Sequence, residues 1–112
     1  MKPNIKKLDK LWGECIAKKF YGKDIWKGGV ASDPHHIVHK SLGYAIRWEL
    51  ENGILLAHAN HQYLHTSPGQ EEFSIWFEKN FPGKYEKLLL QAHSIKKVDL
   101  VEVEETLRRY LE

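Results

Sequence analysis

The residues in this sequence whose types and spacing could do chemistry are its histidines. The chain has seven histidines, and six of them fall in one short stretch, at His35, His36, His39, His58, His61 and His65. Imidazole is a common protein ligand for first-row metals and the usual general base near neutral pH. The cluster therefore predicts a site for metal-assisted or acid–base chemistry in the middle of the chain.

The spacing of the histidines divides them into separate roles. His61 and His65 are four residues apart on a helical pattern, so both side chains share one face and suit a single ion; the alternative is a solvated helix face. His35 and His36 are adjacent on a strand-like pattern, where neighbouring side chains point to opposite faces. If a hairpin closes onto the following helix, His35 approaches His61 and His65 while His36 faces elsewhere.

Two short strands and a helix are predicted around this cluster. β-Branched and apolar residues indicate strands at residues 35–38 and 54–58, and Asn52-Gly53 is a strong turn signal before the second strand. From Asn60, interpreted as an N-cap, the pattern changes to a helix that residues 66–69 end. His58 is thus placed on the second strand, where an extra ligand or a phosphate contact stays open.

Further helices flank this unit on both sides. Apolar residues at spacings of three and four predict four helices, at residues 5–20, 70–79, 84–95 and 100–111. The fold class is therefore α+β, with a small strand–strand–helix unit embedded in helices. No repeat or linker divides the 112 residues, which predicts one domain.

Composition excludes several classes of protein. A hydrophobic fraction of 42% and a charged fraction of 29% argue against disorder. The net charge of +2 supplies no global field, so any nucleic-acid surface must be a local patch. The single cysteine, Cys15, excludes an internal disulfide and a cysteine-built zinc site. With no membrane-length apolar run and no signal-peptide core, we expect a cytoplasmic protein with no membrane partner.

The motif around the histidines resembles the HNH (ββα-metal) endonucleases. Residues 33–38 (DPHHIV), then Asn52, then His61 and His65 carry the likeness, and the intervals of nine and four residues agree with the nuclease colicins. Residues 47–54 are similar to small phage and prophage HNH proteins. The resemblance implies a ββα-metal (HNH) hairpin-plus-helix core.

The implied domain is a single HNH nuclease domain over residues 1–112. Its core motif would span about 33–66, with helical flanks at 5–21 and 70–111.

The resemblance implies a role for each residue of the motif. His35, His61 and His65 would hold one divalent ion, which could be Mg²⁺, Mn²⁺, Ni²⁺ or Zn²⁺. His36 would be the general base that takes a proton from the attacking water, and Asn52 would hold the hairpin loop and so orient His36. These roles suit phosphodiester hydrolysis, because a cation neutralises the phosphate and stabilises the departing 3′ oxygen.

Contacts with DNA are also implied by the resemblance. Arg47 would touch a phosphate, with an ion pair to Glu49 or Glu51 as the alternative. Lys40 and His39 could line the same face, with a solvated surface position as the alternative for each. The partners would be DNA and, as for similar phage proteins, the packaging terminase, in the cytoplasm of the host cell.

One departure from the family's pattern concerns a structural zinc. Many phage members carry two Cys-x-x-Cys pairs around the motif. The corresponding positions are occupied here by Asp24, Lys27, Ala57 and Asn60. We therefore expect no structural zinc, and we expect packing by Trp26, Val30 and Leu56 to stabilise this region instead.

Three functions follow from these observations. The leading one is a metal-dependent DNA endonuclease or nickase that leaves a 5′-phosphate and a 3′-hydroxyl. The alternative is a DNA-binding phage packaging accessory module with slow or vestigial nuclease activity. A histidine-rich metal-binding protein is less favoured, because neither His36 nor Asn52 is needed merely to hold an ion.

Overall fold

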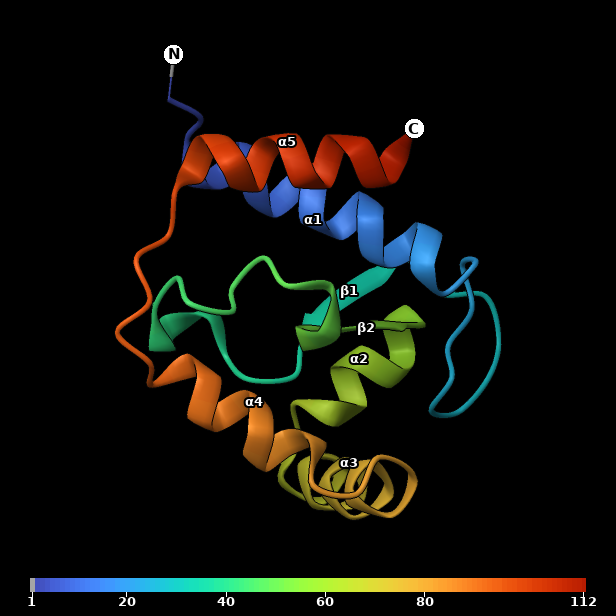
Figure 1. The fold of residues 1–112 in the computed structure, drawn as a ribbon. Helices are drawn as coiled ribbons and strands as arrows, with labels where there is room; N and C mark the ends of the chain where they lie inside the picture. The colour runs from blue at the N-terminus through green and yellow to red at the C-terminus, as the bar shows by residue number, and fades with distance from the viewer. Residues whose placement is uncertain (1) are drawn as a thin grey trace.

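The computed structural model describes residues 2–112 and shows an α+β fold built on a two-stranded antiparallel hairpin. The hairpin consists of β1 (Asp33–His36) and β2 (Gly53–Leu56). Helices α1 (Ile5–Lys19) and α5 (Leu100–Leu111) lie side by side on one side of it (Figure 1). Helix α1 contacts both strands, and α5 packs against α1.

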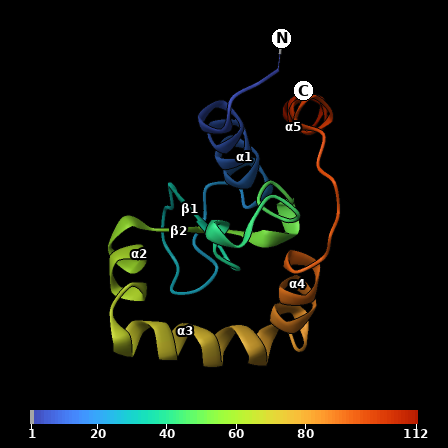
Figure 2. The same ribbon diagram turned by 90° about the vertical axis from the view of Figure 1, so that its left-hand side faces the viewer.

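Three helices form a frame on the other side of the hairpin. They are α2 (His58–Leu64), α3 (Ser67–Asn80) and α4 (Lys84–Ala92). Figure 2 shows α3 as the base of this frame, with α2 rising at one end and α4 at the other. Two short 3₁₀ helices, η1 (Lys40–Leu42) and η2 (Leu50–Asn52), lie in the connection between the strands. None of the helices within residues 2–112 is both long and apolar enough to cross a membrane.

Two of the three clusters of buried apolar residues lie on opposite sides of strand β2. Leu55 packs with the buried face of α1, whereas its neighbours Ile54 and Leu56 pack on the opposite side with Phe73 and Phe77 of α3. This follows from the alternation of side chains along a strand, since all four residues of β2 are buried. A strand covered on both faces explains why this segment is a continuous apolar run.

Close contact between α1 and the hairpin fixes a glycine at the start of β2. A Cβ atom at Gly53 would lie 2.4 Å from Cδ1 of Ile16 and 2.7 Å from Cζ2 of Trp12. Gly53 pairs with His36 across the hairpin. The backbone therefore brings His36 directly beneath helix α1.

The strands differ by a few residues from those predicted at 35–38 and 54–58. β1 begins at Asp33 and ends at His36, because the amide of Val38 donates to the side chain of Asn52 instead of to a strand carbonyl. β2 ends at Leu56, and α2 then begins at His58 with Ala57 as its N-cap. The N-cap prediction for Asn60 and the strand position for His58 are therefore wrong.

The boundaries of α3 and α4 also differ from the prediction. Residues 66–69, predicted to end a helix, instead begin α3: Oγ1 of Thr66 accepts from the amide of Gly69 at 3.1 Å. Pro68 fits the first turn, where a missing N–H leaves no intrahelical bond unmade. α4 ends at Ala92, earlier than expected, whereas α5 begins after the predicted cap, Asp99, which accepts from the amide of Val101.

Candidate metal centre

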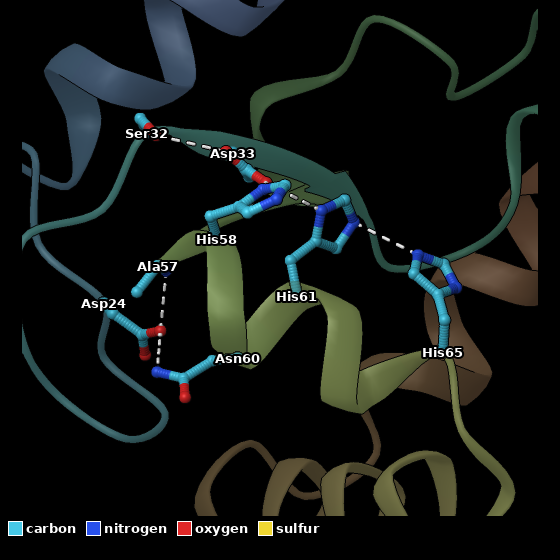
Figure 3. A network of polar contacts seen from close by, with 8 residues as sticks. All are labelled: Asp24, Ser32, Asp33, Ala57, His58, Asn60, His61 and His65. Atoms are coloured by element: carbon cyan, nitrogen blue, oxygen red, sulfur yellow. Dashed lines mark hydrogen bonds and ion pairs between the residues drawn. The ribbon is translucent and has the colours of Figure 1, made fainter.

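Three histidines from two elements converge beside the hairpin. His35 lies on β1, His61 lies on α2, and His65 caps the C-terminus of α2. One ring nitrogen from each of the three lies within 4.8 Å of the other two. The Nε2 atoms of His61 and His65 face one another at 3.2 Å (Figure 3). Two nitrogens bound tetrahedrally to zinc are about 3.3 Å apart, so the arrangement fits a divalent ion.

Burial prepares His35 to act as a ligand. Its ring packs edge-on to both other imidazoles and to Phe73, with ring centres 6.0 Å apart in the last case. Burial, helped by the nearby rings of His61 and His65, lowers the pKa of His35 to about 3. The ring is therefore neutral at physiological pH, and metal ligation requires the neutral form.

Asp33 orients His61 from behind. Oδ2 of Asp33 lies 3.1 Å from Nδ1 of His61 and 2.8 Å from Nδ1 of His58 (Figure 3). The hydrogen bond from His58, against a smaller opposing effect of burial, holds the pKa of Asp33 below its ordinary value, so the carboxylate accepts. A proton on Nδ1 leaves Nε2 of His61 with a lone pair that points toward His65.

Sequence reasoning assigned no role to Asp33. The signal was present, because Asp33 lies two residues before His35 and side chains two apart share one face of a strand. His58 is exposed and bonds to this carboxylate.

His36 lies on the opposite face of the hairpin, as alternation along the strand predicts. Its ring stacks on that of Trp12 in α1, with centroids 3.9 Å apart and planes within 7°. Nε2 of His36 lies 2.9 Å from the carbonyl oxygen of Arg47. Because a carbonyl can only accept, Nε2 carries the hydrogen and Nδ1 keeps its lone pair. Burial lowers the pKa of His36, so the neutral ring prevails near pH 7.

Asn52 fastens the loop that leads away from the histidine pair. Its side chain is fully buried: Oδ1 accepts from the amide of Val38 at 2.8 Å, and Nδ2 donates to the carbonyls of Val38 and Ile46 at 3.0 and 3.4 Å. Its own carbonyl accepts from the amide of Ile37 at 2.9 Å. These bonds fix the backbone directly after His36.

A cleft of about 540 Å³ joins the two faces. It lies between the loop after β1 and helices α3 and α4, and both His35 and His36 line it. His39 and His65 also border it, as do polar side chains of α3. A group held in this cleft could therefore contact the three-histidine cluster and His36 together.

The residues predicted to contact DNA occupy different surroundings. Lys40 and His39 are exposed, and Nδ1 of His39 pairs with Ser41 at 2.8 Å. Arg47 donates from Nε and Nη2 to the two carboxylate oxygens of Asp9, at 3.0 and 2.7 Å. Its ion-pair partner is thus on α1 and is neither Glu49 nor Glu51. A phosphate contact by any of these residues stays a prediction.

A second polar cluster holds the four positions that correspond to the zinc cysteines of the resembling family. Oδ1 of Asp24 accepts from the amides of Trp26 and Lys27, both at 2.8 Å. Oδ2 accepts from the amide of Ala57 at 2.9 Å and from Nδ2 of Asn60 at 2.8 Å (Figure 3). We call this group the Asp24 cluster. One carboxylate thus joins the loop before β1 to the start of α2.

The packing predicted for this region is confirmed in part. Trp26 and Leu56 are buried, and both belong to the cluster formed with Phe73 and Phe77. Val30 is 89% exposed, so the prediction that it packs there is wrong. The turn at residues 28–29, where both glycines have positive φ, sends the chain back along the surface and leaves Val30 at its rim.

Comparisons of the chain with protein-family models, with curated proteins and with solved structures gave no match.

Proposed function

We propose that this protein is a metal-dependent DNA endonuclease or nickase of the HNH (ββα-metal) type. One observation carries the proposal. Three histidine nitrogens converge on one face of the hairpin, while a separate imidazole, whose Nε2 bonds to a backbone carbonyl, occupies the other face and lines the same cleft. Metal binding alone would need only the first of these features.

The proposed reaction is hydrolysis of a phosphodiester bond. A divalent ion held by His35, His61 and His65 would supply positive charge to the phosphate and to the departing 3′ oxygen. Nδ1 of His36 takes a proton from water, whose oxygen attacks phosphorus; the bond to the 3′ oxygen breaks, and this oxygen keeps the electron pair and takes a proton from a solvent water. The products are a 5′-phosphate and a 3′-hydroxyl.

Other side chains support this chemistry without touching the substrate. Asn52 holds the loop after His36, and Asp33 holds the ring of His61. Trp12 prevents the His36 ring from tilting, because the two planes are nearly parallel and in contact. DNA is the partner that follows from this proposal; a phage setting beside the packaging terminase, in the host cytoplasm, follows from the resemblance alone.

Plasmid nicking with Mg²⁺, Mn²⁺, Ni²⁺ and Zn²⁺ in turn tests the proposal. We expect cleavage with at least one ion, its loss in EDTA, and a fall of about 10²–10⁴-fold in His36→Ala, the usual contribution of general acid–base catalysis. His93→Ala is the matched control, since His93 is exposed at the end of α4. DNA binding without cleavage under every ion would favour the packaging accessory module instead.

A further inference from the structure

Helix α1 contacts His36 by two routes. Trp12 covers one side of the ring directly. Asp9, three residues earlier, lies on the same side of the helix and bonds to Arg47, whose carbonyl accepts from Nε2 of His36. Arg47 belongs to the segment of residues 44–49, between the two 3₁₀ helices. Nothing in the spacing of the histidine motif predicts the second route.

Three hydrogen bonds on one carboxylate fix that segment. Oδ1 of Asp9 accepts from Nε of Arg47 at 3.0 Å and from Nε1 of Trp48 at 2.9 Å, and Oδ2 accepts from Nη2 of Arg47 at 2.7 Å. Burial alone would raise the pKa of Asp9, but the bonds from Arg47 and Trp48 hold it below its ordinary value. A paired guanidinium and carboxylate in this fork geometry restrain each other in direction as well as distance.

Other restraints act on the residues on either side of Arg47: Ile46 and Trp48 are buried, and the carbonyl of Ile46 accepts from the amide of Glu49 at 3.1 Å and from Nδ2 of Asn52 at 3.4 Å. The amide of Arg47 donates to the carbonyl of Tyr44 at 3.4 Å, which is long, and the segment belongs to no helix or strand. Nε1 of Trp12 donates to the carbonyl of Glu49 at 2.9 Å, which ties the far end of the segment to α1 as well. Asp9 is the residue that holds the side chain of Arg47 itself, and through it the peptide whose carbonyl faces His36.

We propose that Asp9 is a positioning residue for His36. Acting through Arg47, it holds the carbonyl that selects the Nε2–H form of the imidazole and leaves Nδ1 as the basic nitrogen. The effect on cleavage rests on the proposed function, whereas the effect on the ring does not.

Nuclear magnetic resonance of the metal-free protein tests the ring directly. Long-range ¹H–¹⁵N spectra of the wild type should show His36 with a protonated Nε2 and an unprotonated Nδ1. In Asp9→Asn both nitrogen shifts should move toward each other as the two tautomers mix, and Asp9→Glu should restore much of the wild-type pattern. In parallel, kcat for plasmid cleavage should fall about 10- to 100-fold with KM unchanged, the expected cost of a misplaced catalytic group.

A matched control separates positioning from general weakening of α1. Glu104→Gln removes a different ion pair of this helix, the one with Lys7 at 3.0 Å, and should leave both the His36 shifts and kcat unchanged. If Asp9→Asn does not fold, Arg47→Lys replaces it, because this change keeps the backbone and the charge but loses the fork.

The results decide between the two proposals. A folded variant with unchanged His36 tautomer, or with a tautomer shift but unchanged kcat, overturns the role of Asp9. If the wild type cleaves no DNA, the proposed function fails, and the tautomer shift alone then decides whether Asp9 positions the ring.

Discussion

Two polar clusters flank helix α2, and they are completed in opposite ways. In the Asp24 cluster, one carboxylate meets four N–H donors, so each of its two oxygens accepts two hydrogen bonds from the protein. At the three-histidine cluster, three imidazoles bring ring nitrogens together, with the Nε2 atoms of His61 and His65 3.2 Å apart. These two nitrogens can share one hydrogen, or both can bind one cation.

This difference indicates that the Asp24 cluster stabilises the fold and that the three-histidine cluster can bind a ligand. Asp24 is 4% exposed and its hydrogen bonds join segments 33 and 36 residues apart, so this cluster holds the fold together without a ligand. The histidines gain most from an added ion and contribute least without one. We therefore expect changes in the two clusters to affect different measurements.

The largest effect is expected from removing two ligands. His61→Ala/His65→Ala should abolish binding of divalent ions in isothermal calorimetry, because the three-nitrogen site loses two of its members. The circular dichroism spectrum should stay that of the wild type. His58→Ala is the control, and it should weaken binding less than about 10-fold if His58 acts only on Asp33. Unchanged ion binding in the double variant would contradict the assignment.

Asp33→Asn should weaken ion binding by about 10- to 100-fold, the usual effect of losing the partner behind a ligating histidine. The amide has the shape of the carboxylate but no charge to hold the proton on Nδ1 of His61. Calorimetry with the ion that supports cleavage gives the measurement. An ion affinity equal to that of the wild type would show that the ring of His61 keeps its orientation without the Asp33 carboxylate.

Asp24→Ala should have the opposite effect to the histidine variants: the protein loses stability, and its affinity for the ion changes little. Three backbone amides and Asn60 would lose their acceptor in a buried place, which costs about 2–4 kcal/mol in the free energy of unfolding. A Tm lower by on the order of 10 °C is expected. A variant as stable as the wild type would mean that water replaces the carboxylate.

Chelation should leave the secondary structure intact. EDTA is expected to remove only the stability that ion binding adds to the folded state. This is about 2.7 kcal/mol in the free energy of unfolding when the free ion was at 100 times its Kd, and Tm falls accordingly. Far-ultraviolet circular dichroism at 25 °C should not change. Collapse of the helical signal on chelation would be the signature of a structural metal.

The smallest effect concerns acid. Burial alone would raise the pKa of Asp24, but its hydrogen bonds, led by that from Asn60, hold it below the unfolded value of 3.8. Its contribution to stability is therefore complete above that pH and disappears as pH falls through the folded-state pKa. The difference in Tm between the wild type and Asp24→Asn should shrink over that range. A difference that stayed constant down to pH 2 would refute this origin.

Local patterns predicted the three-histidine cluster well. The four-residue spacing of His61 and His65 and the alternation of His35 and His36 depend only on helix and strand geometry. The residues around His36 were not predictable in this way, because Asp9 and Arg47 are 38 residues apart and meet only through the docking of α1. Residues 66–69 were misassigned because the same Thr-Ser-Pro-Gly chemistry can end one helix or begin the next.

The pairing of the first and last helices has a consequence for the order of assembly. Sγ of Cys15 on α1 bonds to the carbonyl of Leu107 on α5, across 92 residues of chain. During synthesis the hairpin and α2 exist before α5 is made, so α1 has no partner for much of its apolar face until the end. Contacts that close long loops form late. We therefore expect the contact between α1 and α5 to form last, after α1, the hairpin and the three clustered histidines have met through much shorter loops.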